Sequence, residues 1–290
     1  MSAPARAIVG GRLAALGSAS AFAGVATLAG YAYAGDATPV AAVAARLLFG
    51  FAGTLAVVAV LRRPWSIPRR EWAPTLAVTV AWLVVNVGYM ASFYYIPVSL
   101  AVLIFFTFPV QTALVGPLVA GRRPEAATLV AALVAFAGLA LALGPDLSGL
   151  DWRGCALAFA AAVGLMSTFL LSRRLVVQQD MFTFSFNLHL ACAVAVVAYI
   201  VAGGGLPLPK GGAALAALFG VGMFYVVAVL LQFLAIRLTG PARASIVFNA
   251  EPVVTVVAAA VILGESLGPA QIAGVGLVVA GVYLSARADR

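Results

Sequence analysis

Charge is the scarcest property of this sequence. Only 9% of the 290 residues are Asp, Glu, Lys or Arg, whereas globular proteins carry about 25%. Hydrophobic residues make up 64% of the chain, and the mean hydropathy is +1.12. A water-soluble fold could not cover its surface with nine acidic and seventeen basic side chains. The composition therefore excludes a soluble protein and predicts a chain that faces lipid over most of its surface.

Histidine and cysteine are also rare. His189 is the one histidine, which is too few for most zinc sites or for a multi-histidine relay. Cys155 and Cys192 have neither zinc-binding nor redox spacing. We therefore expect no metal site and no cofactor. An integral membrane enzyme would need a catalytic cluster such as His with Asp, and none is recognisable, so we expect a protein that is not an enzyme.

Long apolar runs are what the sequence has in abundance. Ten of them reach the roughly 20 residues of a membrane-spanning helix. They lack the apolar–polar alternation of membrane β-strands. Gly, Pro and Arg clusters separate them, as expected of loops. The runs cover residues 9–33, 38–61, 73–95, 97–119, 126–144, 153–172, 181–202, 212–236, 241–263 and 269–286.

The placement of the basic residues predicts an orientation. If the N-terminus is cytoplasmic, fourteen Lys and Arg residues fall inside, Arg153 and Lys210 fall outside, and Arg46 lies within a run. The positive-inside rule then predicts that both termini are cytoplasmic. The net charge of +8 is thus an orientation signal, and we expect no nucleic-acid partner. Sixteen arginines against one lysine are typical of a GC-rich bacterial genome, so the expected location is the bacterial inner membrane, with multiple passes.

An internal repeat appears when the chain is shifted by 143 residues. Pro109 then falls on Pro252, and Phe105, four residues before the first proline, falls on Phe248. The first run pairs with the sixth. Removal of the first run as a signal peptide, which Ala32-Tyr33-Ala34 could otherwise suggest, would destroy this pairing.

The repeat predicts the architecture. Residues 1–145 and 146–290 each hold five runs, and because five is odd, the second half must insert upside down. We therefore expect an all-α integral membrane protein of ten transmembrane helices, arranged as two inverted five-helix repeats. Inverted repeats are typical of secondary transporters, whose site lies near the midplane between the halves.

Several short motifs resemble a known family. Tyr95-Ile96-Pro97-Val98-Ser99-Leu100-Ala101 and Phe108-Pro109-Val110 resemble the first signature of the EamA family, in the drug/metabolite transporter superfamily. Glu251-Pro252-Val253, Leu263-Gly264-Glu265-Ser266-Leu267 and Ala280-Gly281 resemble the second. The resemblance implies a ten-helix transporter with both ends inside. Bacterial exporters of aromatic and other neutral amino acids, the YddG type, are the most similar in character.

One loop departs from the family pattern. The usual Leu-Gly-Glu after the fourth helix is Ala120-Gly121-Arg122 here, whereas its counterpart in the second repeat, Glu265, keeps the acidic residue. The acidic contact of the first loop is therefore in doubt.

Aromatic and polar side chains inside the runs predict a central pocket. Such groups are costly in lipid unless they face a cavity or a partner. In the third run, Trp82, Asn86, Tyr89 and Phe93 fall at i, i+4, i+7 and i+11 and therefore share one helical face. Tyr225 and Gln232 occupy the equivalent positions of Trp82 and Tyr89 in the second repeat. Ser20, Thr27 and Tyr31 share a face of the first run. The predicted substrate-binding residues are Trp82, Asn86, Tyr89, Phe93, Phe106, Tyr225, Gln232, Asn249 and Thr27. Aromatic walls with a few amide or hydroxyl donors suit an amphipathic solute, but interhelical packing is the alternative role.

Three titratable residues and two prolines lie within the runs. Glu251 is a candidate for proton coupling or a structural carboxyl group. Arg46 and His189 are equivalent under the 143-residue shift, and for both we favour a structural role over a functional one. Pro109 and Pro252 leave carbonyl groups without donors, so they predict kinks that serve either as hinges or in substrate binding.

Two runs, at 126–144 and 269–286, are rich in small residues and have few polar groups near their centres. We expect them to pack closely, outside the pocket. The spaced small residues are Ala131, Ala135, Gly138 and Ala142 in the first run, and Gly276 and Ala280 in the second.

Together these features predict a secondary transporter that exports small metabolites. Aromatic and other neutral amino acids are the favoured substrates, carried by alternating access around a central cavity between the repeats. The alternative is a broad multidrug or other metabolite carrier; a passive pore and an integral membrane enzyme are more distant. The expected partners are a small-molecule substrate and the lipid bilayer, and proton coupling and the choice between monomer and homodimer stay open.

Overall fold

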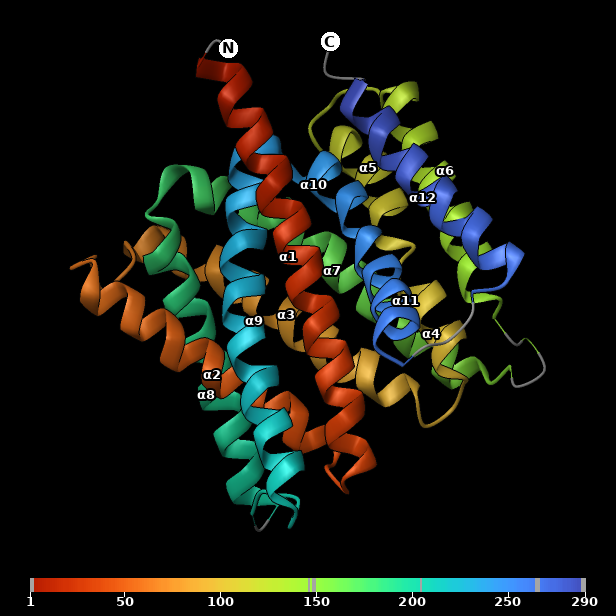
Figure 1. Cartoon of the computed structure of the whole chain (residues 1–290). Coiled ribbons are helices and arrows are strands. Elements are labelled where there is room, and N and C mark those ends of the chain that lie inside the picture. Colours follow the sequence, from red (N-terminus) through yellow and green to blue (C-terminus); the bar gives the residue numbers. More distant parts are fainter. Residues whose placement is uncertain (1–2, 146, 148–149, 204, 264–266, 288–290) are drawn as a thin grey trace.

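The chain folds into a bundle of helices (Figure 1). This computed structural model describes residues 3–145, 147, 150–203, 205–263 and 267–287, and within them every regular element is helical. The elements are α1 (Ala3–Ala34), α2 (Pro39–Val60), η1 (Arg69–Glu71), α3 (Trp72–Ser92), α4 (Val98–Phe105), α5 (Phe108–Val119), α6 (Ala126–Leu143), α7 (Trp152–Gln178), α8 (Met181–Ala202), α9 (Gly212–Thr239), α10 (Pro241–Phe248), α11 (Ala250–Leu263) and α12 (Pro269–Arg287).

The predicted all-α membrane fold is confirmed. Nine helical segments of the described residues are long and apolar enough to cross a membrane, and each coincides with a predicted run. The remaining run, at 241–263, is occupied by α10 and α11 in succession. Large apolar side chains such as Val60, Val119 and Trp152 lie exposed on the outside of the bundle, as lipid-facing residues do.

Local sequence signals explain where the helices begin and end. The side chains of Thr38, Asp151 and Asp180 cap α2, α7 and α8, each accepting a hydrogen bond from a backbone N–H two or three residues ahead. Gly144 ends α6 with a φ of +49°, a conformation that glycine adopts without strain.

The 143-residue repeat is visible in the helix boundaries. The shift carries α4 onto α10 at both ends, and it carries the first residue of α6 onto the first residue of α12. The span formed by α4 and α5 is broken near its middle, and so is the span formed by α10 and α11. Both halves therefore have the same order of helices, including the interruption.

The packing of α6 against α12 establishes the inversion. A methyl group added at Gly138, Gly274 or Gly281 would come within 2.5–2.7 Å of the facing helix, so the two backbones are in close contact. The facing pairs are Ala135 with Gly281, Gly138 with Val278, and Ala142 with Gly274. Residue numbers rise along one helix as they fall along the other, so these equivalent helices run antiparallel. The second repeat is therefore inverted, and the two ends of the chain lie at the same end of the molecule (Figure 1).

The small residues predicted for this contact are correct in α6, whereas in α12 Ala280 is half-buried and Gly276 is wrong. Ala131, Ala135, Gly138 and Ala142 are all buried. In α12, however, Gly276 is exposed, and among the described residues no atom lies within 4 Å of the position that a Cβ would take there. Gly274 and Gly281 fill the predicted role. A helix that is apolar on every side gives no signal of which face is buried, and this explains the error.

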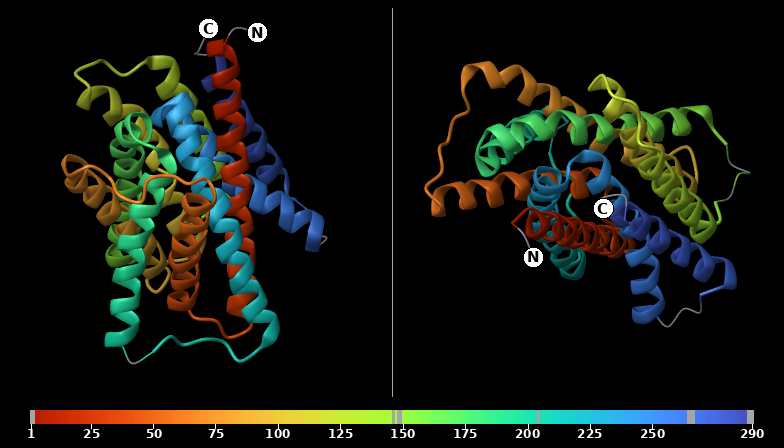
Figure 2. Two further views of the ribbon diagram at one scale, coloured as in Figure 1. Left: turned by 90° about the vertical axis from the view of Figure 1, so that its left-hand side faces the viewer. Right: turned by 90° about the horizontal axis from the view of Figure 1, so that it is seen from above.

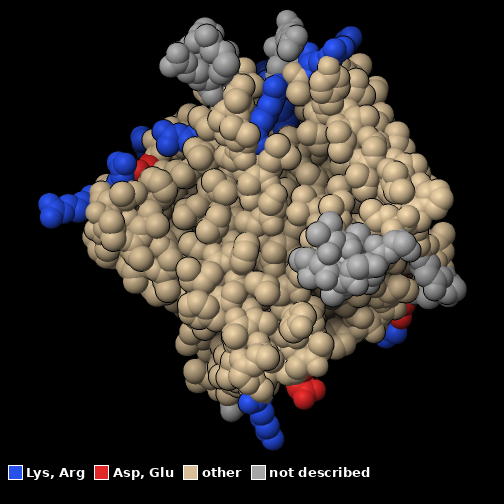
Figure 3. Space-filling view, viewed as in Figure 1, with Lys and Arg blue, Asp and Glu red and all other residues tan. Residues whose placement is uncertain are grey.

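The remaining helices pair between the repeats. The helix α1 packs along α9, α3 along α7, and α2 along α8, so neither half forms a separate body. The view from above in Figure 2 shows α6 and α12 together on one side of the bundle. Figure 3 shows Lys and Arg gathered towards the end where the termini lie, with a nearly uncharged middle. The predicted cytoplasmic location of the termini depends on this uneven distribution of basic residues. That location stays a prediction.

Candidate functional site

A cavity of about 740 Å³ opens between the first repeat and α11. Its walls come from the second half of α1, the beginning of α2, the end of α3, and α4 and α11. Leu143, the last residue of α6, also lines it, so the run at 126–144 does not lie wholly outside the pocket as expected. These segments lie in the half of the molecule away from the termini. The volume is within the range of small-molecule sites, about 300–1,000 Å³.

Aromatic rings form much of the wall. The ring of Tyr89 stacks on that of Phe105 with 4.4 Å between centroids, and Phe93 meets Tyr89 edge-on at 4.9 Å. Phe106, which also lines the cavity, packs edge-on against Phe105 at 5.5 Å. Because each ring holds the next in position, this wall is preorganised to receive a flat or aliphatic group.

Two opposite charges reach the cavity from different helices. Arg46 comes from α2 and Glu251 from α11. The Nε of Arg46 donates to the carbonyl of Ala42 at 3.4 Å, and the hydroxyl of Thr255, another lining residue, donates to the backbone carbonyl of Glu251 at 3.0 Å. No ion pair of the described residues joins the two charges to each other. The cavity therefore offers both a cation and a carboxyl group to a ligand.

Six of the residues singled out from the sequence line this cavity. They are Arg46, Tyr89, Phe93, Phe106, Glu251 and Pro252. Whether any of them binds a substrate stays a prediction.

Trp82, Asn86 and Tyr225 lie outside it, in the packed layer between the repeats. Trp82 Nε1 donates to the hydroxyl of Tyr225 at 2.7 Å, and the two are equivalent under the 143-residue shift. Asn86 Nδ2 donates to the carbonyl of Trp82 at 2.8 Å. All three side chains are buried, so the two repeats meet here through a direct hydrogen bond between equivalent residues.

Gln232, Asn249 and His189 are also buried in the second repeat. Under the shift they are the equivalents of Tyr89, Phe106 and Arg46, all of which line the cavity. Among the described residues Gln232 Nε2, Asn249 Oδ1 and His189 Nε2 have no hydrogen-bond partner, although His189 Nδ1 lies 2.8 Å from the carbonyl of Ser185. The region of the second repeat that corresponds to the cavity is thus closed and holds unpaired polar atoms.

Thr27 is exposed and is not among the residues that line the cavity. Its hydroxyl donates to the carbonyl of Ala23 at 2.9 Å, as threonines in membrane helices commonly do. Ser20 and Tyr31 are exposed on the same side of α1. A polar side chain that is satisfied by its own helix therefore carries no signal of a pocket.

Both prolines lie at the breaks in their spans. Pro109 follows the interruption between α4 and α5 and lies in the first turn of α5, while Pro252 has the same position in α11. At the first break a side chain supplies one of the missing backbone hydrogen bonds: the hydroxyl of Thr107 donates to the carbonyl of Ile104 at 2.7 Å. The breaks are as predicted, and the roles of the prolines as hinges stay a prediction.

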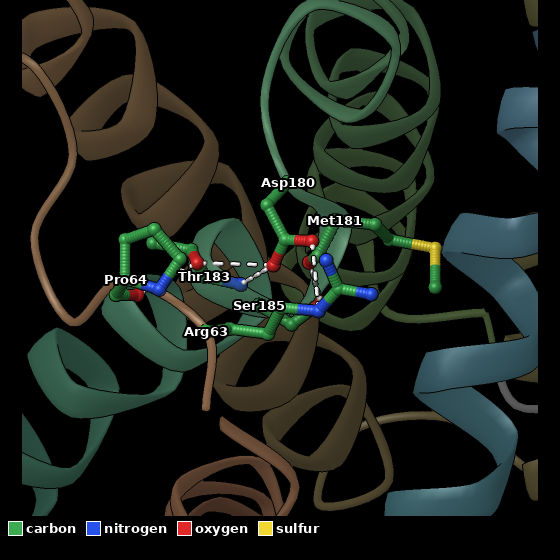
Figure 4. A network of polar contacts seen from close by, with 6 residues as sticks. All are labelled: Arg63, Pro64, Asp180, Met181, Thr183 and Ser185. Atoms are coloured by element: carbon green, nitrogen blue, oxygen red, sulfur yellow. Dashed lines mark hydrogen bonds and ion pairs between the residues drawn. The ribbon is translucent and has the colours of Figure 1, made fainter. Parts of the chain in front are cut away.

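Polar contacts close the end of the molecule near the termini. Arg63 Nε lies 3.6 Å from a carboxylate oxygen of Asp180, and the hydroxyl of Thr183 donates to the carbonyl of Pro64 at 2.7 Å (Figure 4). These contacts tie the α2–η1 loop of the first repeat to the beginning of α8 in the second. The cavity and these contacts therefore lie at opposite ends of the molecule.

A second closing contact involves Glu71. Its side chain is buried and lies 3.4 Å from Arg70 and 3.8 Å from Arg174, which belongs to the second repeat. Arg174 is exposed, so the contact lies at the edge of the molecule.

Several lining residues were missed by the sequence reasoning. On α1 the cavity touches the face that includes Phe22, Ala26 and Tyr33. This face is mostly small and apolar, and its small residues leave the space that forms the cavity. Ser99 and Thr255 were also missed; Thr255 lies one helical turn after Glu251, and that spacing could have drawn attention to it. The Glu265 loop lies outside the described residues.

The chain is similar to known proteins along its whole length. Residues 9–144 and again residues 152–287 match the EamA-like transporter family. A solved structure titled "Crystal structure of protein" superposes with a TM-score of 0.81 at 19% identity, over 98% of this chain and 99% of that one, which indicates a shared fold. No curated protein matches. With two matched segments that together span nearly all of its residues, the chain belongs to the EamA-like transporter family, whose members are membrane transporters.

Proposed function

We propose that this protein is a secondary carrier that exports aromatic and other neutral amino acids. The observation that supports this substrate class is a basic and an acidic side chain, Arg46 and Glu251, on different walls of a cavity lined mostly by aromatic and aliphatic side chains. A zwitterion with an apolar side chain has the complementary set of groups.

Each part of such a substrate has a chemical partner in the cavity. The planar guanidinium of Arg46 suits a carboxylate, which it can bind through two parallel hydrogen bonds. Glu251 suits the ammonium group. The rings of Tyr89, Phe93 and Phe106 suit an aromatic or aliphatic side chain through edge and face contacts. A nucleotide sugar would want several cations, and Arg46 is the one Lys or Arg among the cavity's lining residues.

A mismatch between the halves supports alternating access. The first repeat contributes an open cavity, while the equivalent residues Gln232, Asn249 and His189 are packed with unpaired polar atoms. Leaving buried polar groups unpaired is costly. An opposite state that opens the second repeat and closes the first would hydrate them, and exchange between the two states would carry the substrate across.

Transport by purified protein in liposomes tests the substrate class. We expect saturable counterflow of labelled phenylalanine and leucine, and competition by unlabelled tryptophan. Tryptamine and indole-3-propionate, which each lack one charge of tryptophan, should compete poorly. Equal competition by either analogue would contradict binding of a zwitterion.

The charged residues are tested in the same assay. Arg46→Gln should weaken transport and reduce discrimination against tryptamine, whereas Glu251→Gln should reduce discrimination against indole-3-propionate. If protons are the coupling ion, Glu251→Gln should also remove the response to a pH gradient. Arg62→Gln, at the exposed end of α2, is the matched control and should transport like the unsubstituted protein.

A multidrug carrier is the second candidate, and one observation favours it. An apolar cavity of about 360 Å³ adjoins the central one between α2, α3 and α8, and both are lined by Pro39, Met90 and Tyr94. Its described lining residues carry no charge. Val87→Trp would fill this smaller cavity. If ethidium competes with phenylalanine in the unsubstituted protein but not in this variant, the result would support the broader substrate range.

A further inference from the structure

A second large cavity lies at the end of the molecule near the termini. It measures about 570 Å³ and lies where the end of α5 and the beginning of α6 meet α7 and the junction of α9 with α10. The antiparallel packing of α6 and α12 puts the first residues of α6 beside the last residues of α12, at the end where the chain terminates. The pocket is thus at one surface of the membrane-spanning bundle and between the two repeats.

The charge of this pocket is strongly one-sided. Arg122 and Arg123 come from the first repeat, and Arg173 and Arg243 from the second, whereas Glu125 supplies the single carboxyl group among the described lining residues. That carboxylate already accepts a hydrogen bond from the hydroxyl of Thr128 at 2.9 Å. Four guanidinium groups around one pocket form a receptor for an anion with several oxygen atoms, since arginine binds phosphate and carboxylate through paired hydrogen bonds.

A hydrogen-bonded turn precedes two of these arginines. Gly121 has a φ of +67°, and the N–H of Arg122 donates to the carbonyl of Pro117 at 2.8 Å. This bond closes the turn at the end of α5, where Arg122 and Arg123 line the pocket. It is also the loop where the sequence departs from its own second repeat, since Arg122 stands where the shifted position holds Glu265. The change from acidic to basic residue makes this pocket cationic.

A third arginine is held by the end of α9. Arg173 Nη1 donates to the carbonyl of Ile236 at 2.7 Å and contacts the carbonyl of Arg237. Its guanidinium is therefore oriented by backbone groups while its residue lines the pocket.

Part of the lining of this pocket is apolar. Pro117, Val119 and Leu170 belong to it, and Val119 is 79% exposed on the outer surface of the bundle, where acyl chains would lie. We propose that the pocket binds the headgroup of an acidic phospholipid, with the phosphate among the arginines and an acyl chain along Val119. Acidic lipids collect at basic pockets between membrane helices in this way. The headgroup would bridge the two repeats at their closed end.

Lipid titration of the purified protein tests this proposal without any measurement of transport. Short-chain phosphatidylglycerol should raise the melting temperature saturably in neutral detergent, whereas phosphatidylcholine of the same chain length should have little effect. The variant Arg122→Gln/Arg123→Gln should raise the half-maximal lipid concentration about thirtyfold, because each arginine near an acidic lipid gives about a fivefold gain in affinity. Both residues are exposed in a loop, so the variant should fold.

The matched control removes the same charge from the same end of the molecule. Arg62→Gln/Arg69→Gln, outside the pocket, should keep the response to phosphatidylglycerol. An equal loss in this control, or an equal response to phosphatidylcholine, would overturn the proposal. Saturable stabilisation by inorganic phosphate alone, with displacement of the lipid, would also overturn it in favour of a soluble anion.

Discussion

At the scale of single residues, the hydrogen bond between Trp82 and Tyr225 is the most informative contact. Equivalent residues of an inverted repeat can meet only near the axis that relates the halves, so this bond marks that axis. Trp82→Phe leaves the Tyr225 hydroxyl without its donor, and Tyr225→Phe leaves the indole N–H without its acceptor. Each change should cost about 0.6–1.7 kcal/mol, the range measured for hydrogen bonds between membrane helices. Equilibrium unfolding in mixed micelles measures the cost.

The double variant distinguishes the bond from general packing. Because Trp82→Phe/Tyr225→Phe removes donor and acceptor together, it should cost less than the sum of the two single changes. Simple additivity would mean that the 2.7 Å contact contributes nothing specific. The variant Tyr33→Phe is the control. It removes a hydroxyl that donates to a weak acceptor, the sulfur of Met90, at 3.6 Å, so the free energy of unfolding should change little.

At the scale of helices, the α6–α12 contact depends on glycine. A Cβ at Gly138 would lie 2.6 Å from the backbone of Val278, so Gly138→Val must push the two helices apart. Overpacking of this kind costs about 1–3 kcal/mol. Gly276→Val adds the same side chain to the exposed face of α12 and should leave stability unchanged. Melting temperatures in detergent compare the two, and equal losses would show that the contact is not tight.

The positions of the helices could be predicted almost completely, because the length of an apolar run is enough to identify a membrane-spanning helix. An apolar run of about 20 residues has few alternatives in a membrane, and capping residues such as Asp180 refine its ends. The facing side of a helix could not be predicted where every side is apolar, as in α12. Lipid and a neighbouring helix select the same side chains, so Gly276 and Gly274 looked alike in sequence although only Gly274 meets α6.

At the scale of the whole molecule, the proposed alternation would leave half of the candidate site closed in any one state. Tyr89, Phe106 and Arg46 could be selected because aromatic and charged groups are unusual in lipid, and they line the cavity. Their equivalents Gln232 and Asn249 were selected on the same grounds, but they lie in the closed half. The sequence specifies both halves equally, since both states are encoded by one chain. The half that is closed in this structure is bridged by contacts between residues far apart in the sequence, such as Arg63 with Asp180, and no pattern along the chain reveals them.

The alternation of the two halves can be measured with one pair of equivalent positions. Ala29 lines the open cavity, while Ser172, its equivalent under the 143-residue shift, is buried with a hydroxyl that has no partner among the described residues. In a background without Cys155 and Cys192, Ala29→Cys should react with an impermeant thiol reagent added on the side away from the termini. Ser172→Cys should stay protected at rest and react from the side of the termini during turnover.

The closing contacts set the balance between these two reactions. Arg63→Gln/Asp180→Asn removes the ion pair that ties the α2–η1 loop to α8, which should shift the population towards the state open at the termini. Labelling of Ser172→Cys should then rise without substrate, and labelling of Ala29→Cys should fall in proportion, because the two states exclude each other. Arg153→Gln, whose partner Asp151 lies in the same helix end, is the matched control and should change neither. Simultaneous labelling of both cysteines at full rate would indicate an open pore, since a carrier exposes its two halves in turn.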